Sequence, residues 1–133
     1  MQTVLVVESD PAQLRTLRQK LRVLLEKAGV SEKDCQEVLV AVGEGCTNAI
    51  LHSYSGEPGH PIRVTVAQRR EKLIFKIRDF GRKIDFAKVK TPELPPKKGG
   101  GLGVHLMRTL MDGMTYRTGH RRGNELILVK RRK

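Results

Sequence analysis

Residues 62–81 have the sequence IRVTVAQRREKLIFKIRDFG, and this stretch decides the fold. Apolar and polar residues alternate on both sides of a charged turn near residues 70–72. Alternation of this kind is typical of a strand with one buried face, and two such runs joined by a short turn predict a β-hairpin. Because a hairpin pairs its strands antiparallel, we expect a mainly antiparallel sheet.

Two helical patterns precede this hairpin. Asp10 can cap a first helix, in which leucines recur every three or four residues until Gly29 ends the pattern. Ser31 has the features of a second helix start, and an apolar face then continues to about residues 52–54. A valine-rich run at residues 3–8 predicts a strand before both helices.

The chain after the hairpin predicts a loop, a helix and a second hairpin. Residues 82–99 are polar and rich in lysine and proline, and loops of this length are usually functional. Glycines at residues 99–103 open a third helix, and residues 114–118 pair with residues 125–129. This order predicts one domain over residues 1–133, an α/β two-layer sandwich with three helices on one face of a mainly antiparallel sheet.

Composition limits the classes of function. The net charge of +12 favours polyanionic partners, but two Tyr, three Phe and no Trp supply few platforms for stacking single-stranded nucleic acid. No stretch has the roughly 20 apolar residues of a membrane-spanning helix, and no secretory signal is visible, so we expect a cytoplasmic protein. Cys35 and Cys46 would lie about 16 Å apart along one helix, which predicts free thiols.

Two groups of polar residues could carry chemistry. Glu44 and Asn48 share one helix face, and His52 follows one turn later. An asparagine oxygen can ligate Mg²⁺, and a carboxylate can accept a proton from a nucleophile. Asp79 and Gly81 follow a strand, where a carboxylate can accept a hydrogen bond from an exocyclic amine. The alternative interpretation of the first group is a solvated stripe on the helix. The alternative interpretation of the second group is an ordinary turn.

The glycine run before the third helix predicts an anion site. Backbone N–H groups at the N-terminus of a helix are unobstructed where glycines surround them, and they attract phosphate groups. A flexible hinge is the alternative. Lys97 and Lys98 stand just before this run, and either of them could meet the phosphates. The other candidate phosphate-binding residues are Gly100, Gly101, Leu102 and Gly103.

The three motifs together resemble a known family. Residues 42–52, VGEGCTNAILH, resemble the N box of GHKL-type ATPases and kinases. Residues 79–81 resemble the G1 box of that family, and residues 99–103 resemble its G2 box. Within the superfamily, nearly the whole chain is similar to the anti-sigma-factor serine/threonine kinases of bacteria. The resemblance implies a Bergerat-type ATP-binding fold.

The resemblance also implies roles for individual residues. Asn48 would hold the Mg²⁺ that bridges the phosphates of ATP, and Glu44 would act as general base. Asp79 would bind the adenine amino group with Gly81 beside it, and residues 82–99 would form a lid over ATP. The remaining nucleotide-binding residues would be His52, Lys98, Gly100, Gly101, Leu102 and Gly103.

The partners implied by the resemblance are proteins. Such a kinase would phosphorylate a STAS-type anti-sigma antagonist and would sequester a sigma factor, and a homodimer is compatible with it. No membrane or nucleic-acid partner is expected. Gly45 stands where relatives often have Ala, and Asn124 where many have Thr. The alternatives are a non-catalytic ATP-binding switch and a basic nucleic-acid-binding module.

Overall fold

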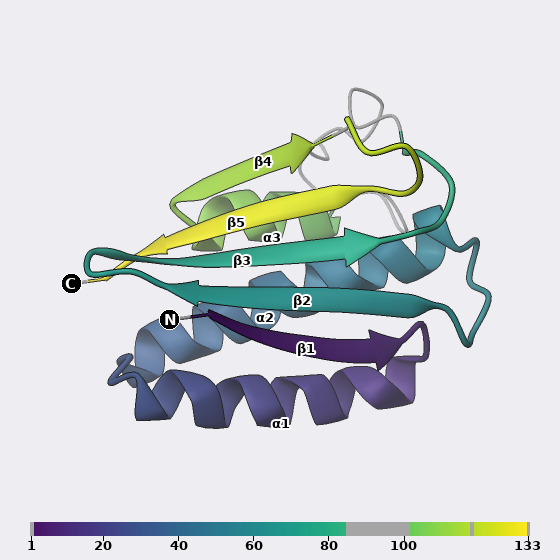
Figure 1. Ribbon diagram of the computed structural model, residues 1–133. Coiled ribbons are helices and arrows are strands. Elements are labelled where there is room, and N and C mark those ends of the chain that lie inside the picture. Colours follow the sequence, from purple (N-terminus) through teal and green to yellow (C-terminus); the bar gives the residue numbers. More distant parts are fainter. Residues whose placement is uncertain (1, 85–101, 118, 133) are drawn as a thin grey trace.

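The computed structural model describes residues 2–84, 102–117 and 119–132, without the side chain of Leu102. Five strands form one antiparallel sheet in the order β1-β2-β3-β5-β4 (Figure 1). The strands are β1 (Gln2–Glu8), β2 (Pro61–Gln68), β3 (Lys72–Asp79), β4 (Gly113–Arg117) and β5 (Glu125–Arg131). The helices are α1 (Pro11–Lys27), α2 (Glu32–Asn48), the short π-helix η1 (Ala49–Ser53) and α3 (Leu102–Leu110).

The hairpin expected from residues 62–81 forms the middle of the sheet. Val64 lies opposite Ile77, and Val66 lies opposite Phe75, so that the apolar positions of both strands share one face. The second predicted hairpin is β4–β5, and β5 also pairs with β3. The end of β3, where Asp79 lies, is therefore flanked by a neighbouring strand on each side.

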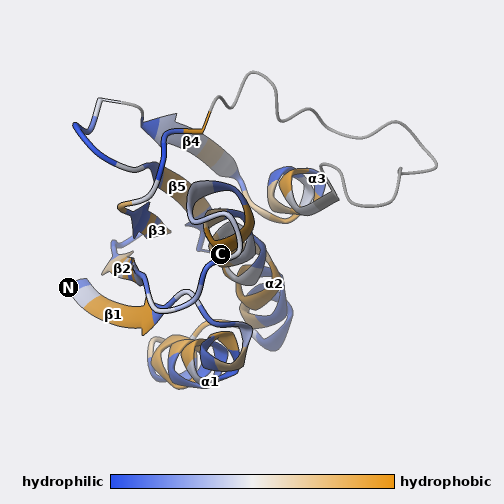
Figure 2. Cartoon of the chain, turned by 90° about the vertical axis from the view of Figure 1, so that its right-hand side faces the viewer, coloured by the Kyte–Doolittle hydropathy of each residue, from blue (hydrophilic) through white to orange (hydrophobic). Residues whose placement is uncertain are grey.

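All three longer helices cover the same face of the sheet. Figure 2 shows α1, α2 and α3 on one side of the strands, with no described element on the other side. The core between the two layers includes Leu17, Val38, Val64, Phe75 and Leu128, each at most 1% exposed. This arrangement confirms the predicted two-layer sandwich.

The helix starts follow the predicted capping residues. The Asp10 carboxylate accepts a hydrogen bond from the amide of Ala12 at 2.9 Å, and the Ser31 hydroxyl accepts one from the amide of Asp34 at 3.2 Å. Gly29 has a φ of +77°, which suits glycine at a helix end. Each cap satisfies an otherwise unpaired backbone group, so the local sequence sets these boundaries.

The end of α2 differs from the predicted one. The α-helical pattern stops at Asn48, and η1 continues it with a wider turn, in which the amide of Tyr54 donates to the carbonyl of Ala49 at 3.0 Å. Turns of this kind are rare and often lie at functional sites. Both cysteines are buried free thiols, as predicted.

Candidate functional site

A pocket lies between α2 and the end of β3. Its volume is about 20 Å³, which is room for one water molecule and far below that of a ligand pocket, so a ring would enter only if the wall moved. Polar groups enter it from three elements and the rest of its wall is apolar. Its lining residues are Gly45, Asn48, Ala49, Ile77, Asp79, Ile84, Tyr116, Asn124 and Leu126.

The carboxylate of Asp79 is the most deeply placed charged group of this pocket, since the residue is only 4% exposed. One oxygen accepts the Ser53 hydroxyl at 2.9 Å, and the other accepts the Asn124 amide and the Gly81 backbone N–H, both at 3.1 Å. A carboxylate has about four acceptor positions. The Asn124 amide also reaches the oxygen that accepts from Ser53, at 3.5 Å. The buried charge is therefore well satisfied, and a donor from a ligand would replace this long contact.

Asn124 and Ser53 are site residues that the motif analysis did not assign. Asn124 exchanges both backbone hydrogen bonds with Asp79, at 3.0 and 3.3 Å, and its side-chain oxygen accepts the amide of Ile84 at 2.9 Å. The sequence offered one signal for Ser53, which is a polar residue on the otherwise apolar face that ends α2. Asn124 had been noted only as a departure from the family pattern.

Two glycines allow the backbone to close around Asp79. A Cβ at Gly81 would lie 2.6 Å from the carbonyl carbon of Ser53 and 2.8 Å from the ring of Tyr54. A Cβ at Gly123 would lie 2.6 Å from the Cα of Phe80. The backbone of Ser53 occupies the space that a side chain at Gly81 would need. The glycine permits close packing of η1 against the end of β3.

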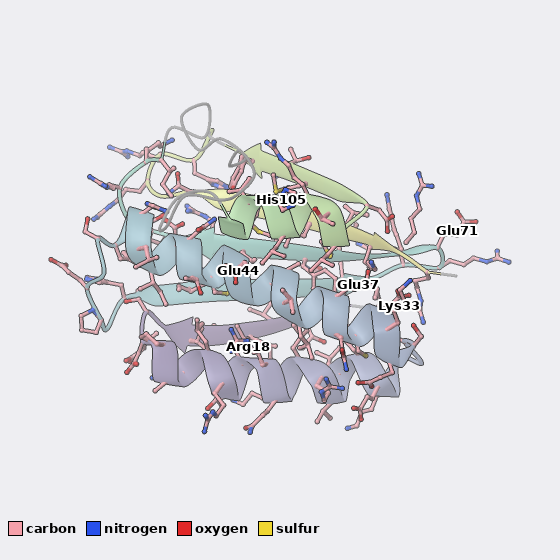
Figure 3. The ribbon with its side chains drawn as sticks, turned by 180° about the vertical axis from the view of Figure 1, so that it is seen from behind. Arg18, Lys33, Glu37, Glu44, Glu71 and His105 are labelled. Atoms are coloured by element: carbon pink, nitrogen blue, oxygen red, sulfur yellow. The ribbon has the colours of Figure 1, made fainter. Side chains whose placement is uncertain are left out.

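Glu44 lies beside the first turn of α3. The carboxylate is half-buried, and a Cβ at Gly103 would lie 2.7 Å from its Oε2 atom. Figure 3 shows Glu44 midway along α2 on the side of the molecule covered by helices. Because the N-terminal turn of a helix carries partial positive charge, this position suits an acidic group or an anion. The structure thus brings the predicted base to the end of the glycine segment.

Asn48 lies one turn further along α2, at the mouth of the pocket that holds Asp79. Its side chain and that of Tyr116 on β4 both line this pocket. Burial raises the pKa of Tyr116 to about 12, against the smaller opposing effects of Arg108 and Asn48. The phenol therefore stays neutral.

The other predicted site residues have different outcomes. His52 is exposed and does not line the pocket, and its backbone carbonyl accepts a hydrogen bond from Arg82 at 2.9 Å. Lys98, Gly100, Gly101 and all of the predicted lid beyond residue 84 lie outside the described residues. Their proposed contacts with a nucleotide therefore stay predictions.

The described part of the chain lacks two other kinds of feature. Within it, no three His, Cys, Asp or Glu side chains are grouped so that they could hold a metal ion. A magnesium ion in this site would depend mainly on phosphate and water oxygens, which is how Mg²⁺ usually binds beside nucleotides. None of the described helices has the length and apolar character needed to cross a membrane.

Comparison with known proteins identifies the family. Residues 7–130 match the histidine kinase-like ATPase domain. The chain belongs to this family. ATP is accordingly the ligand class of the histidine kinase-like domain, whose match includes Glu44, Asn48 and Asp79. The resemblance seen in the three sequence motifs is confirmed.

Relatives within the family include bacterial kinases. The chain is 31% identical over 119 residues to the serine-protein kinase RsbW of Bacillus pumilus, covering 80% of this chain and 72% of that protein. It is 30% identical over 115 residues to the protein of that name in Bacillus velezensis, covering 80% of this chain and 71% of that one.

A solved structure has the same fold. It contains the RsbU and RsbW domains of Rv1364c from Mycobacterium tuberculosis, and the match has a TM-score of 0.71 over 98% of this chain. Sequence identity is 18%, and the match covers 32% of that longer chain, so the likeness concerns the fold. The histidine kinase-like fold predicted from the motifs is thereby confirmed.

Proposed function

We propose that this chain is an ATP-dependent protein-serine/threonine kinase that acts as an anti-sigma factor and phosphorylates an anti-sigma antagonist. The observation that carries the proposal is the position of Glu44 beside Gly103, one helical turn from the pocket of Asn48 and Asp79. The relatives named serine-protein kinase RsbW support the same chemistry.

The adenine of ATP would enter the pocket of Asp79. The pocket has an apolar wall and a buried carboxylate, and its wall would move outward to admit the ring. An exocyclic amino group would donate to that carboxylate, and Ile77 and Leu126 would contact the ring. These features support a purine that carries an amino group over one that carries a carbonyl group.

The phosphates would extend from this pocket toward α3. Asn48 and Glu44 lie on successive turns of one helix face. The phosphate chain would therefore pass Asn48 first as it extends out of the adenine pocket. The Asn48 amide oxygen can ligate Mg²⁺, and the metal would neutralise phosphate charge. The backbone at the start of α3, where Gly103 lies, would meet the phosphates.

Glu44 would accept the proton of the substrate hydroxyl. Gly103 leaves the carboxylate uncovered by a side chain at the first turn of α3. A general base of this kind typically contributes about 100-fold or more to the rate. The hydroxyl would belong to a serine or threonine of a STAS-type antagonist, and a sigma factor would be the second partner. A cytoplasmic location and a homodimer stay predictions.

The proposal is tested by phosphotransfer from γ-labelled ATP to purified STAS-type domains of the same organism. We expect wild type to label one of them on serine or threonine. Glu44→Gln keeps the shape of the side chain, and we expect it to lower the labelling rate about 100-fold or more while ATP still binds. Glu71→Gln is a matched control, since Glu71 is exposed at the turn between β2 and β3.

Two results would contradict the kinase proposal. Equal rates for Glu44→Gln and wild type would remove Glu44 from the chemistry. Nucleotide binding by wild type without transfer to any STAS-type domain would favour the alternative, a non-catalytic switch that binds ATP and a partner.

A further inference from the structure

A second pocket lies beside the end of β3 and is lined in part by the residues that follow Asp79. Its volume is about 400 Å³, and none of its nine lining residues is acidic. Four of the nine are basic, namely Arg82, Lys83, Arg121 and Arg122. We call this cavity the basic pocket. Its lining residues lie around the end of the sheet at which β3 ends and β5 begins.

Two more arginines add charge next to the basic pocket. Arg63 on β2 and Arg78 on β3 lie directly opposite each other in the sheet, an arrangement that destabilises a ladder. Both guanidinium groups lie over the ring of Phe80, at 5.4 and 4.4 Å from its centroid. The ring offsets part of the repulsion. An anion bound nearby would remove more of it.

Few carboxylates neutralise this charge. The guanidinium groups of Arg82, Arg121 and Arg122 form no ion pair with any carboxylate in the described part of the chain. The carboxylate of Glu57 lies at the rim, 3.3 Å from His60. Glu125 is held by Arg117 and His120, at 3.6 and 3.3 Å. The described carboxylates therefore leave the charge of these three arginines available to a ligand.

The aromatic rings of the basic pocket are already engaged. The Tyr54 ring stacks on His60 with centroids 4.8 Å apart, and its hydroxyl bonds to Phe80 and Pro61. Phe80 has Arg78 over its ring. Binding of single-stranded nucleic acid relies on rings on which bases stack. Guanidinium groups, by contrast, match carboxylates in paired hydrogen bonds.

We propose that the basic pocket is a docking site for an acidic segment of a protein partner, rich in Asp or Glu. Arg82, Arg121 and Arg122, all three exposed, would receive its carboxylates. The site adjoins the nucleotide pocket, because the Asn124 amide donates both to Asp79 and, at 2.9 Å, to the carbonyl of Arg82. Arg82 and Lys83 also begin the predicted ATP lid, whereas Arg121 and Arg122 have no assigned role at the nucleotide, so the test changes only these two.

The test uses fluorescein-labelled hexaglutamate as the probe and fluorescence anisotropy as the readout, without nucleotide. We expect binding by wild type that weakens as salt rises from about 0.05 to 0.2 M. Arg121→Glu/Arg122→Glu should weaken it about tenfold or more, because rim charges turn from attractive to repulsive. Arg121→Gln/Arg122→Gln should weaken it less, in the same direction.

The matched control is Arg69→Glu/Arg70→Glu. These exposed arginines lie at the turn between β2 and β3, at the opposite end of the sheet, and the change in net charge is the same. We expect hexaglutamate to bind this variant at most about twofold more weakly than wild type. Amide shifts on peptide addition should centre on Gly81 and Arg121 to Gly123.

Several outcomes would overturn the proposal. Equal weakening by the control would mean that only net charge matters. Tighter binding of hexathymidylate than of hexaglutamate would indicate a nucleic-acid site. We expect inorganic phosphate and chloride to displace the peptide equally at the same ionic strength. Stronger displacement by phosphate would indicate a phosphate site. ATP titration of the same variants separates a failure here from a failure of the kinase proposal.

Discussion

The amide of Asn124 donates to the carboxylate of Asp79 at 3.1 Å, and this bond connects β5 to the end of β3 at the back of the nucleotide pocket. Both residues are almost fully buried, at 3% and 4% exposure. The backbones of the two residues are also paired. The acidic group that would recognise adenine is therefore held from a strand that lies about 45 residues away in sequence.

Asn124→Ala tests this relationship. The change leaves the buried carboxylate with fewer donors, and we expect the free energy of unfolding to fall by about 1–3 kcal/mol. ATP should also bind more weakly, because Asp79 is less firmly positioned. Urea denaturation measures the first effect, with Thr115→Ala on the exposed side of β4 as control. Equal stability of Asn124→Ala and wild type would contradict the account.

Gly81→Ala tests the close packing of η1 on β3. The new methyl group would overlap the backbone of Ser53, which cannot yield as a flexible side chain can. We expect a loss of roughly 2 kcal/mol or more in thermal or urea unfolding. Gly119→Ala is the control, since a Cβ there meets nothing within 4 Å. A Gly81→Ala protein as stable as this control would show that η1 is not closely packed against the end of β3.

Lys130→Met tests a buried ion pair between β5 and α2. The Lys130 side chain is 9% exposed, contacts the Glu37 carboxylate and donates to the carbonyl of Leu110 at 2.6 Å. Removing it leaves a partly buried charge, and we expect a loss of about 3 kcal/mol in the free energy of unfolding. Glu37→Leu added to Lys130→Met should restore most of the stability.

A second ion pair of Glu37, with Lys33, supplies the control for Lys130→Met. Lys33 lies 4.0 Å from Glu37, but its side chain is 80% exposed. Figure 3 also shows Lys33 at the surface. Exposed pairs contribute little, so Lys33→Met should change the free energy of unfolding by less than about 1 kcal/mol. Similar losses for the two lysine variants would contradict a dominant role of burial.

Tyr116 makes the fold sensitive to alkaline pH. Its pKa rises to about 12 on folding from an ordinary value near 10. Because the folded value is the higher one, the stabilisation is complete below about pH 10 and is lost as pH rises toward 12. Each unit by which the folded pKa exceeds the ordinary one corresponds to about 1.4 kcal/mol in the free energy of unfolding.

The measurement is the difference in urea stability between wild type and Tyr116→Phe at several pH values from about 9 to 12. Phenylalanine cannot ionise, so we expect the free energy of unfolding of wild type to fall relative to that of the variant as pH rises. Other groups titrate equally in both proteins and cancel in the difference. A difference that stays constant with pH would mean that Tyr116 titrates normally.

The sequence predicted the layers well because the fold follows from local patterns. The alternation in residues 62–78 fixes one hairpin, and the caps at Asp10 and Ser31 fix two helix starts. These signals act within a few residues, so no distant contact is needed to read them. The pairing of β3 with β5 depends on contacts between distant segments, and no local pattern specified it.

The site was predicted in part. Glu44, Asn48 and Asp79 belong to motifs of short spacing, and the structure places each of them at the pocket or at the start of α3. Ser53 and Asn124 become site residues only through tertiary contacts with Asp79. The wider turn of η1 depends on packing against β3, which the helical periodicity of the sequence does not reveal.

Calorimetric titration of ATP into wild type and Asn48→Ala, with and without Mg²⁺, tests the central claim most directly. The account predicts Mg²⁺-dependent binding by wild type, and it predicts that the Asn48→Ala change abolishes this binding in a protein whose circular dichroism is unchanged. A well-folded wild-type protein that binds no ATP in the presence of Mg²⁺ would contradict the assignment of the nucleotide site.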